Sequence, residues 1–415
     1  MRRVLSLDRV RPKCLLGIRL SASSDLSPVG AGEAAPSSRR ISWDVVRVVA
    51  VFFVILGHVT SSGPRIHPEL GEYFPRSNLP FGAAGLMVVS AYFVCVTIRR
   101  ARPTRWLWHR CARLLPTFVV AVLLTYGLTR YAVAGFNGLT FPGGFLGTMF
   151  ADPISVDGPA EGVRPWYLPT PLDLGTNLAM IVPWSADFHW VDPSYWTMPI
   201  QVLAFAAAAM LFPRRLVRGA RIFWLLWAMI VIPLLLPVAM HPFDTVREWV
   251  APAVSGLGLS YARLFAVGVA IWLWSNGRMG TRHLVALTLV VTTAQFVSSP
   301  DLSEINLPVM LAFGVFVLLV AKAASGPDWM FPVFVRFRAQ LRWLAGITFG
   351  VYLVQQQLGY VLARLLADLG VGPWPRLVVI FGAAVVAGWL LTVVVERPAG
   401  RLLTRRIRHR QAPAR

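Results

Sequence analysis

Two ionisable residues in an apolar segment near residue 50 are the first candidates for chemistry. Arg47 and His58 have ten residues between them, and those ten are apolar side chains or glycine. At 3.6 residues per turn, this spacing places both side chains on one face of a helix, about 16 Å apart along its axis. Asp44, three residues before Arg47, is close enough on such a helix to pair with its guanidinium. Ionisable groups are costly within a bilayer, so their presence indicates function.

The chemistry expected of His58 is proton transfer at a hydroxyl group. An imidazole titrates near neutral pH, so it can serve as a general base, and it can also carry an acyl group transiently. The alternative is a histidine that only donates a hydrogen bond to a neighbouring helix. The face that His58 shares with Arg47 favours the catalytic interpretation.

A second candidate site consists of two arginines one helical turn apart, Arg110 and Arg113. Guanidinium groups at positions i and i+3 suit the binding of phosphate oxygens, because each group offers parallel N–H donors. The pair is therefore a candidate site for a phosphate-bearing substrate, although the pair alone is more typical of the alternative that follows. A basic cluster at the membrane edge, which fixes topology or binds lipid headgroups, is the alternative.

Transmembrane helices are the elements expected to position these residues. The chain of 415 residues is 56% hydrophobic and 14% charged, and its apolar residues form blocks of a length that crosses a bilayer core of about 30 Å. Long apolar blocks, unlike the alternating strands of a barrel, predict an all-α polytopic membrane helix bundle. We place about ten transmembrane helices near residues 44–61, 79–98, 114–133, 196–212, 222–240, 251–275, 283–299, 305–323, 343–365 and 376–395.

The distribution of charge predicts how the bundle is oriented. The formal net charge of +21 comes from short basic clusters between apolar blocks, which is typical of cytoplasmic loops and argues against a nucleic-acid partner. Arginines gather in alternate connecting segments, starting with the N-terminal one, and the other segments hold most of the acidic residues. This alternation predicts a multi-pass protein of the cytoplasmic membrane with both termini in the cytoplasm.

Three segments lie outside the predicted helices. Residues 1–40 have the composition of a disordered basic cytoplasmic arm, and residues 401–415 form a basic tail suited to the anionic inner leaflet. The outer loop at about 134–195 is long enough to suggest a function. Its aromatic side chains either stack on sugar rings or form an interfacial belt. These residues are Trp166, Tyr167, Trp184, Trp190 and Tyr195.

Polar residues also occur within later apolar segments. The amides of Gln201 and of the run Gln355-Gln356-Gln357 either join helices by hydrogen bonds or line a wet cavity. Glu396 precedes Arg397 where the last apolar segment ends, and we interpret it as half of an ion pair at a helix end. The three cysteines have no spacing typical of a metal site, and we expect no structural disulfide.

An ordered set of motifs between residues 40 and 400 resembles the acyltransferase-3 family of integral membrane acyltransferases. The motifs are Asp44-x-x-Arg47 with His58, the segment 84–93 with Ser90, Arg110-x-x-Arg113 before Leu-Leu-Pro, the segment 195–201 with Trp196 and Gln201, the segment 346–354 with Tyr352, and Glu396-Arg-Pro. Three positions depart from the family pattern. Ala91 replaces a glycine, Gln201 a glutamate and Gln355 a histidine, and these changes leave the acceptor class open.

The resemblance implies an enzyme that moves an acyl group, expected to be acetyl, from cytoplasmic acyl-CoA to a hydroxyl of a carbohydrate or glycosylated acceptor. It implies that His58 acts as base or acyl carrier, that Arg47 assists it, and that Arg110 and Arg113 bind the donor. It further implies supporting roles for Asp44, Ser90, Trp196, Gln201, Tyr352, Gln355 and Glu396. Acyl-CoA is a donor substrate, and no permanently bound cofactor or metal is expected. The oligomeric state is left open.

Two other function classes are compatible with the same residues. A transporter or flippase of an acylated glycan or lipid would use His58 as a proton relay. A non-catalytic membrane scaffold of the same fold would have lost the chemistry, as the glutamines at 201 and 355 suggest. The two alternatives differ from the enzyme in predicting no acyl transfer.

Overall fold

The computed structural model describes residues 40–410, except 75–78, 80, 100–101, 159–162, 214–218, 241, 243 and 298–306. The expected disordered arm at residues 1–40 lies outside this range, apart from Arg40. The described chain is built from helices, together with one antiparallel pair of two-residue strands, β1 (Leu139–Thr140) and β2 (Ile154–Ser155). The prediction of an all-α membrane bundle is therefore confirmed.

Seven helical segments in the described ranges are long and apolar enough to cross a membrane. The first combines α1 (Ile41–Gly57), the π-helical turn η1 (His58–Ser62) and α2 (Gly63–Ile66). The last combines α16 (Pro373–Leu391), the π-helical turn η7 (Thr392–Glu396) and the start of α17 (Arg397–Arg410). Between them come α3 (Phe81–Ile98), α4 (Pro103–Phe136), η4 (Pro193–Trp196) with α7 (Thr197–Leu211), α8 (Arg221–Met240) and α12 (Leu307–Ser325).

An eighth span results if a bent pair of helices counts as one. The pair comprises α9 (Asp244–Gly256) and η6 (Leu259–Tyr261) with α10 (Ala262–Ser275), and its bend is 51°. Of the remaining predicted spans, α11 (Thr281–Val297) is a shorter apolar helix, and the one at 343–365 is broken into α14 (Arg338–Val354) and α15 (Gln357–Asp368). The expected number of ten is thus not confirmed. Short elements are η2 (Pro68–Leu70), α5 (Gly144–Phe150), α6 (Pro171–Leu178), η3 (Val182–Trp184) and α13 (Pro332–Arg336).

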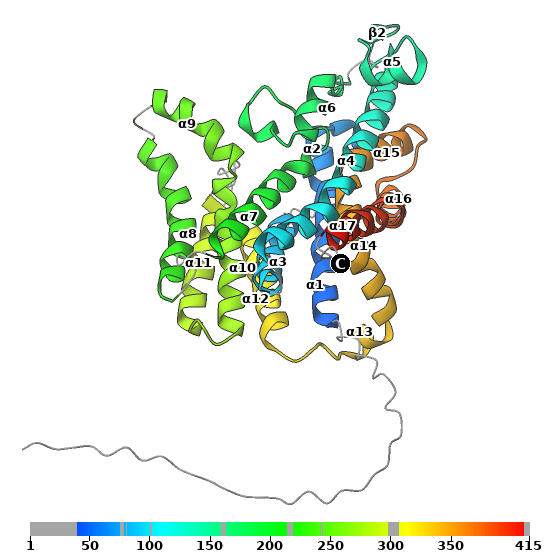
Figure 1. The fold of residues 1–415 in the computed structure, drawn as a ribbon. Coiled ribbons are helices and arrows are strands. Elements are labelled where there is room, and N and C mark those ends of the chain that lie inside the picture. The colour runs from blue at the N-terminus through cyan, green and yellow to red at the C-terminus, as the bar shows by residue number, and fades with distance from the viewer. Residues whose placement is uncertain are drawn as a thin grey trace, which may run out of the picture. The chain divides into compact units, whose positions relative to one another are not determined.

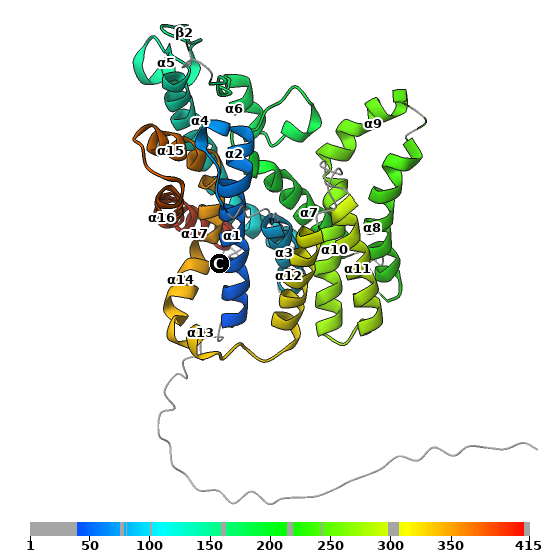
Figure 2. The same ribbon diagram turned by 180° about the vertical axis from the view of Figure 1, so that it is seen from behind.

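Helix α1 lies in the middle of the bundle, packed against α3 on one side and α14 on the other (Figures 1 and 2). Glycines allow these helices to cross closely, as small residues do in other membrane bundles. A Cβ atom at Gly82 of α3 would lie 2.4 Å from the carbonyl oxygen of Ala50, and one at Gly388 of α16 would lie 2.4 Å from the nitrogen of Val351. The pattern of small residues therefore brings the backbones that carry the candidate site close together.

The long loop after α4 is folded and not extended. Arg130 is buried within α4, and its three guanidinium nitrogens donate to the carbonyl oxygens of Thr148, Pro169 and Ala151 at 2.6, 2.5 and 2.7 Å. Thr170 caps α6 in a reciprocal capping box with Asp173. Figure 1 shows α5 and α6 gathered at the end of the bundle that carries α2. This arrangement places the loop beside the C-terminal end of the first span.

Candidate active site

His58 contacts Gln355 where two interrupted helices meet. The Nδ1 atom of His58 lies 3.0 Å from Oε1 and 2.9 Å from Nε2 of the Gln355 amide. His58 opens the π-helical turn η1, and Gln355 lies in the break between α14 and α15. Such π-helical turns occur frequently at functional sites, because they turn side chains away from the regular helical register. The structure thus joins two residues that the sequence had singled out separately.

Asp192 holds the helix break in place from the other side. Its carboxylate accepts hydrogen bonds from the backbone N–H of Ser194 at 2.7 Å and of Gln357 at 2.9 Å. The side chain is fully buried, and burial raises the pKa of Asp192 to about 6 despite these hydrogen bonds. Asp192 was not among the residues predicted from the sequence. The available signal was the run Asp-Pro-Ser, in which an aspartate before proline is typical of a helix N-cap.

Tyr352 reinforces the same junction. Its hydroxyl donates to the carbonyl oxygen of Ser194 at 2.9 Å, so that α14 is tied to η4. Trp196 instead packs against Tyr261 of η6, with ring centroids 4.4 Å apart and the rings tilted by 32°. Tyr352 therefore supports the surroundings of His58 through backbone atoms, whereas the contact of Trp196 is with another part of the bundle.

Two other predicted site residues make no polar contact with the site. Ser90 of α3 and Gln201 of α7 are half-buried, and neither forms a hydrogen bond to a described residue. The amide of Gln201 does not join helices by a hydrogen bond within these ranges. The structure therefore brings Gln355 to His58 but does not bring Ser90 or Gln201 there.

A cluster around Phe93 connects the first and third spans. The guanidinium carbon of Arg47 lies 4.7 Å from the centre of the Phe93 ring, which is a cation–π distance. Arg110 donates from Nη2 to the carbonyl oxygen of Phe93 at 3.4 Å and to Oγ1 of Thr97 at 2.8 Å. Asp44, one turn from Arg47, is buried. Arg47 and Arg110 thus meet at one residue, although they belong to different helices.

Arg113 turns to a different partner. Its Nε atom donates to Oε1 of Glu396 at 2.6 Å, in an ion pair where Glu396 is 6% exposed and Arg113 is 58% exposed. Glu396 is therefore paired across the bundle, and its partner is Arg113 of α4. Residues i and i+3 of a helix differ by about 60° around its axis, which allows Arg110 to face α3 while Arg113 faces η7. The two guanidiniums do not converge on one another in this structure.

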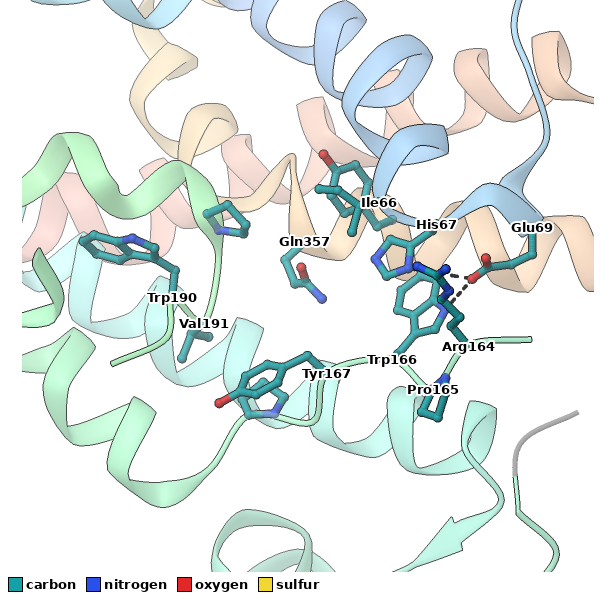
Figure 3. A pocket seen from close by; sticks show the side chains of 13 residues that line it. Ile66, His67, Glu69, Arg164, Pro165, Trp166, Tyr167, Trp190, Val191 and Gln357 are labelled. Carbon is teal, nitrogen blue, oxygen red and sulfur yellow. Dashed lines mark hydrogen bonds and ion pairs between the residues drawn. The ribbon is translucent and has the colours of Figure 1, made fainter. Parts of the chain in front are cut away.

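A cavity of about 330 Å³ opens next to the helix break (Figure 3). Figure 3 shows Gln357 between Trp190 on one side and the stacked rings of His67 and Trp166 on the other. The cavity is lined by Ile66, His67, Glu69, Arg164, Pro165, Trp166, Tyr167, Pro169, Trp190, Val191, Pro193, Gln357 and Tyr360. The three loop aromatics were predicted from the sequence to stack on sugar rings or form a belt, and Gln357 belongs to the glutamine run expected to join helices or to line a wet cavity.

The carboxylate of Glu69 in the cavity wall is engaged by neighbouring residues. His67 stacks on Trp166 with centroids 3.7 Å apart, and Nε1 of Trp166 donates to Oε1 of Glu69 at 2.5 Å. Arg364 lies 3.6 Å from the same carboxylate oxygen. Burial lowers the pKa of His67, Glu69 opposes this shift and Arg364 adds to it, so the site favours the neutral imidazole.

The five loop aromatics predicted from the sequence divide into two groups. Trp166, Tyr167 and Trp190 line the cavity. Tyr195 is buried, with its hydroxyl 3.0 Å from Oγ1 of Thr125, and Trp184 packs against Gly256. Only the first group is therefore placed to meet a ligand.

The cavity and His58 are neighbours through two short connections. Gln357 lines the cavity two residues after Gln355, the partner of His58, and Gln356 donates to the hydroxyl of Tyr360 at 3.2 Å. In addition, a Cβ atom at Gly63, just after the turn that His58 opens, would lie 3.1 Å from the Tyr360 ring. The cavity wall and the histidine are thus parts of one packed unit.

Comparison with known proteins agrees with this arrangement. The family model described as an acyltransferase domain matches residues 40–393, which include His58, Gln355, Arg110, Arg113 and the whole cavity lining. No protein of curated function and no solved structure matches the chain significantly. Because the family model covers most of the sequence, the chain belongs to the acyltransferase-3 family and is a membrane acyltransferase.

Proposed function

We propose that the protein is an O-acyltransferase that moves an acyl group, in the simplest case acetyl, from cytoplasmic acyl-CoA to a hydroxyl of a carbohydrate or glycosylated acceptor. The observation that carries the proposal is the contact between His58 and Gln355 inside an acyltransferase domain. A histidine with one ring nitrogen held by a neighbour presents the other nitrogen for reaction. When Oε1 of Gln355 accepts from Nδ1–H, the Nε2 atom carries the reactive lone pair.

Two routes through His58 balance chemically. In the direct route, Nε2 takes the proton of the acceptor hydroxyl while its oxygen attacks the thioester carbonyl. The carbon–sulfur bond then breaks, and the coenzyme A thiolate receives the proton. In the covalent route, Nε2 itself attacks the thioester carbonyl, the carbon–sulfur bond breaks, and coenzyme A leaves as the thiolate. The acceptor oxygen then attacks the acyl-imidazole, the carbon–nitrogen bond breaks, and the proton of the acceptor hydroxyl neutralises the thiolate. The contact with Gln355 orients the ring equally well for both.

In this proposal the arginines bind the acyl-CoA donor. Arg113 is more than half exposed, so phosphate oxygens of coenzyme A can reach its guanidinium while Glu396 orients it. Arg110 adds positive charge one turn earlier on α4, and Arg47 meets it at Phe93. Arg47 and His58 are about 16 Å apart along the helix, which a long pantetheine arm can bridge.

The orientation of the protein belongs to the same proposal. Both termini and the arginine motifs face the cytoplasm, where acyl-CoA is made, and the loop with the cavity faces the opposite side of the cytoplasmic membrane. The positive-inside pattern of the sequence supports this orientation. The donor and the acceptor then approach His58 from opposite ends of the first span.

Acetyl-CoA binding to detergent-purified protein tests the donor site. We expect wild type to bind acetyl-CoA with micromolar affinity, and Arg110→Ala/Arg113→Ala to bind at least tenfold more weakly. Arg278→Ala/Arg282→Ala removes the same charge between α10 and α11 and is expected to bind like wild type. No binding by folded wild type would contradict the proposed donor, and equal binding by both double variants would place the donor site elsewhere.

A further inference from the structure

The cavity beside the helix break has the composition of a binding site and is separate from the arginines assigned to the donor. We propose that it binds one glycosyl ring of the acceptor and presents a hydroxyl of that ring to His58. This inference rests on the proposed function and adds the place and the residues of acceptor recognition. The cavity volume of about 330 Å³ lies at the lower end of the range for small-molecule sites, about 300–1,000 Å³. A cavity of this size suits one or two sugar rings.

Aromatic side chains form much of the wall. Tyr167 and Trp190 come from the loop, and Tyr360 comes from α15. Flat rings with an apolar face suit the C–H face of a sugar, and their polar edges suit its hydroxyls. A belt residue would face lipid, whereas Trp190 is half-buried and lies against the same cavity as the polar Gln357 (Figure 3). The wall is therefore built for a ligand that is apolar on its faces and polar at its edges.

Gln357 supplies a hydrogen-bonding group that is available to a ligand. Its backbone N–H is taken up by Asp192, but its side-chain amide makes no hydrogen bond to a described residue. An amide offers one acceptor and two donors, so it can bind two neighbouring hydroxyls of a sugar ring. Glu69 is less available, because Trp166 and Arg364 already contact its carboxylate. The available amide thus lies at the part of the wall closest in sequence to Gln355.

The chain segment 355–357 connects the cavity with the histidine. Gln357 contacts the cavity and Gln355 contacts His58, so two residues of one chain segment touch the acceptor site and the reacting imidazole. Asp192 fixes this segment by its hydrogen bond to the N–H of Gln357. A ring anchored by Gln357 and Trp190 is therefore held at a fixed distance from His58, as group transfer requires.

Equilibrium binding of simple sugars to purified wild type is the first test. The probes are methyl glycosides of glucose, galactose, mannose and rhamnose. Their binding is measured by saturation-transfer NMR in the presence of acetyl-CoA. We expect at least one glycoside to bind wild type, and to bind Trp190→Ala and Gln357→Ala at least fivefold more weakly. Trp190→Phe, which keeps an aromatic ring, is expected to retain most of the affinity. Trp184→Ala, in the same loop but packed on Gly256, is the matched control and should bind like wild type.

The results separate this inference from the proposed function, because acetyl-CoA affinity is measured on the same samples. Weakened glycoside binding with unchanged acetyl-CoA affinity in Trp190→Ala and Gln357→Ala supports the acceptor site. Acetyl-CoA binding by wild type without binding of any glycoside overturns the inference and leaves the proposed function standing. Glycoside binding by both variants as tight as that of wild type overturns the inference in the same way. Failure of folded wild type to bind acetyl-CoA contradicts the proposed function itself.

Discussion

Replacing Gln355 by leucine removes the only side-chain partner that the described structure shows for His58. The two side chains have similar size, so the change deletes the amide and leaves the packing around the break between α14 and α15 nearly intact. The lost contact joins Nδ1 of His58 to an amide that is fully buried. An N–H group left without a partner in such surroundings costs about 1–3 kcal/mol. If that cost falls on the productive orientation of the ring, kcat falls by about 5- to 150-fold, at 1.36 kcal/mol for each factor of ten.

The assay is steady-state transfer of [14C]acetyl from acetyl-CoA by purified protein in liposomes. We expect kcat to fall while the KM for acetyl-CoA stays within twofold, since Gln355→Leu does not touch Arg110 or Arg113. Gln201→Leu makes the same replacement in α7, away from His58, and is expected to keep kcat within twofold of wild type. A folded Gln355→Leu protein with wild-type kcat would refute the reasoning.

Gln355→Glu tests which end of the amide holds the histidine. A carboxylate only accepts hydrogen bonds, so it replaces Oε1 but not Nε2. If Nδ1–H of His58 donates to Gln355, the glutamate variant recovers activity relative to the leucine variant. Equal loss in both variants would instead indicate that Nε2 of Gln355 donates to Nδ1.

Three further predictions concern the stability of the fold that carries the site. Arg113→Ala leaves the buried carboxylate of Glu396 without its ion-pair partner and should lower the free energy of unfolding by about 1–2 kcal/mol. The loss is no larger because Arg113 is 58% exposed and its charge is screened by solvent. Adding Glu396→Gln should restore most of the stability, which Tm measures. Asp192 has a folded pKa of about 6 against an ordinary 3.8, so it contributes stability below pH 4 that is lost as pH rises through 6. The difference in unfolding free energy between wild type and Asp192→Asn should therefore decrease by up to about 3 kcal/mol from pH 4 to pH 7, and a constant difference would contradict the raised pKa. Gly388→Ala places a Cβ 2.4 Å from the nitrogen of Val351 and should cost about 1–3 kcal/mol, whereas Gly382→Ala, in the same helix with open space, should be neutral or stabilising. Equal Tm values for the two alanine variants would show that the close crossing is not needed.

The candidate residues could be predicted from the sequence, but their partners could not. His58 and Gln355 are 297 positions apart, and hydropathy and spacing say nothing about which helices meet. The glutamine at 355 is a departure from the family pattern, and the structure shows that the same position contacts the histidine. The prediction of a phosphate site at Arg110-x-x-Arg113 likewise rested on the spacing of two residues within one helix. It could not reveal that Arg110 faces Thr97 while Arg113 faces Glu396.

The number of spans and the acceptor cavity depended on features that hydropathy averages out. The apolar block at 343–365 reads as one span, yet its backbone breaks at Gln355 and Gln356, and the block at 251–275 bends by 51°. The break at 355–356 is held by a tertiary contact, the hydrogen bond from the N–H of Gln357 to Asp192, which no local pattern encodes. The bend at the other block coincides with Gly258, which has a left-handed φ of 61°. The cavity combines residues from the first span, the long loop and α15, and of these the sequence predicted the loop aromatics and the glutamine run.

Acetyl transfer by His58→Ala is the most direct test of the central claim. The measurement compares wild type, His58→Ala and His283→Ala for transfer of [14C]acetyl from acetyl-CoA to a glycoside that wild type modifies. His283 lies exposed on α11, so its replacement controls for loss of a histidine elsewhere in the bundle. We predict that His58→Ala binds acetyl-CoA like wild type but transfers acetyl at least a hundredfold more slowly, as expected when a general base or nucleophile is lost. Transfer by His58→Ala at the rate of His283→Ala would contradict a catalytic role for His58.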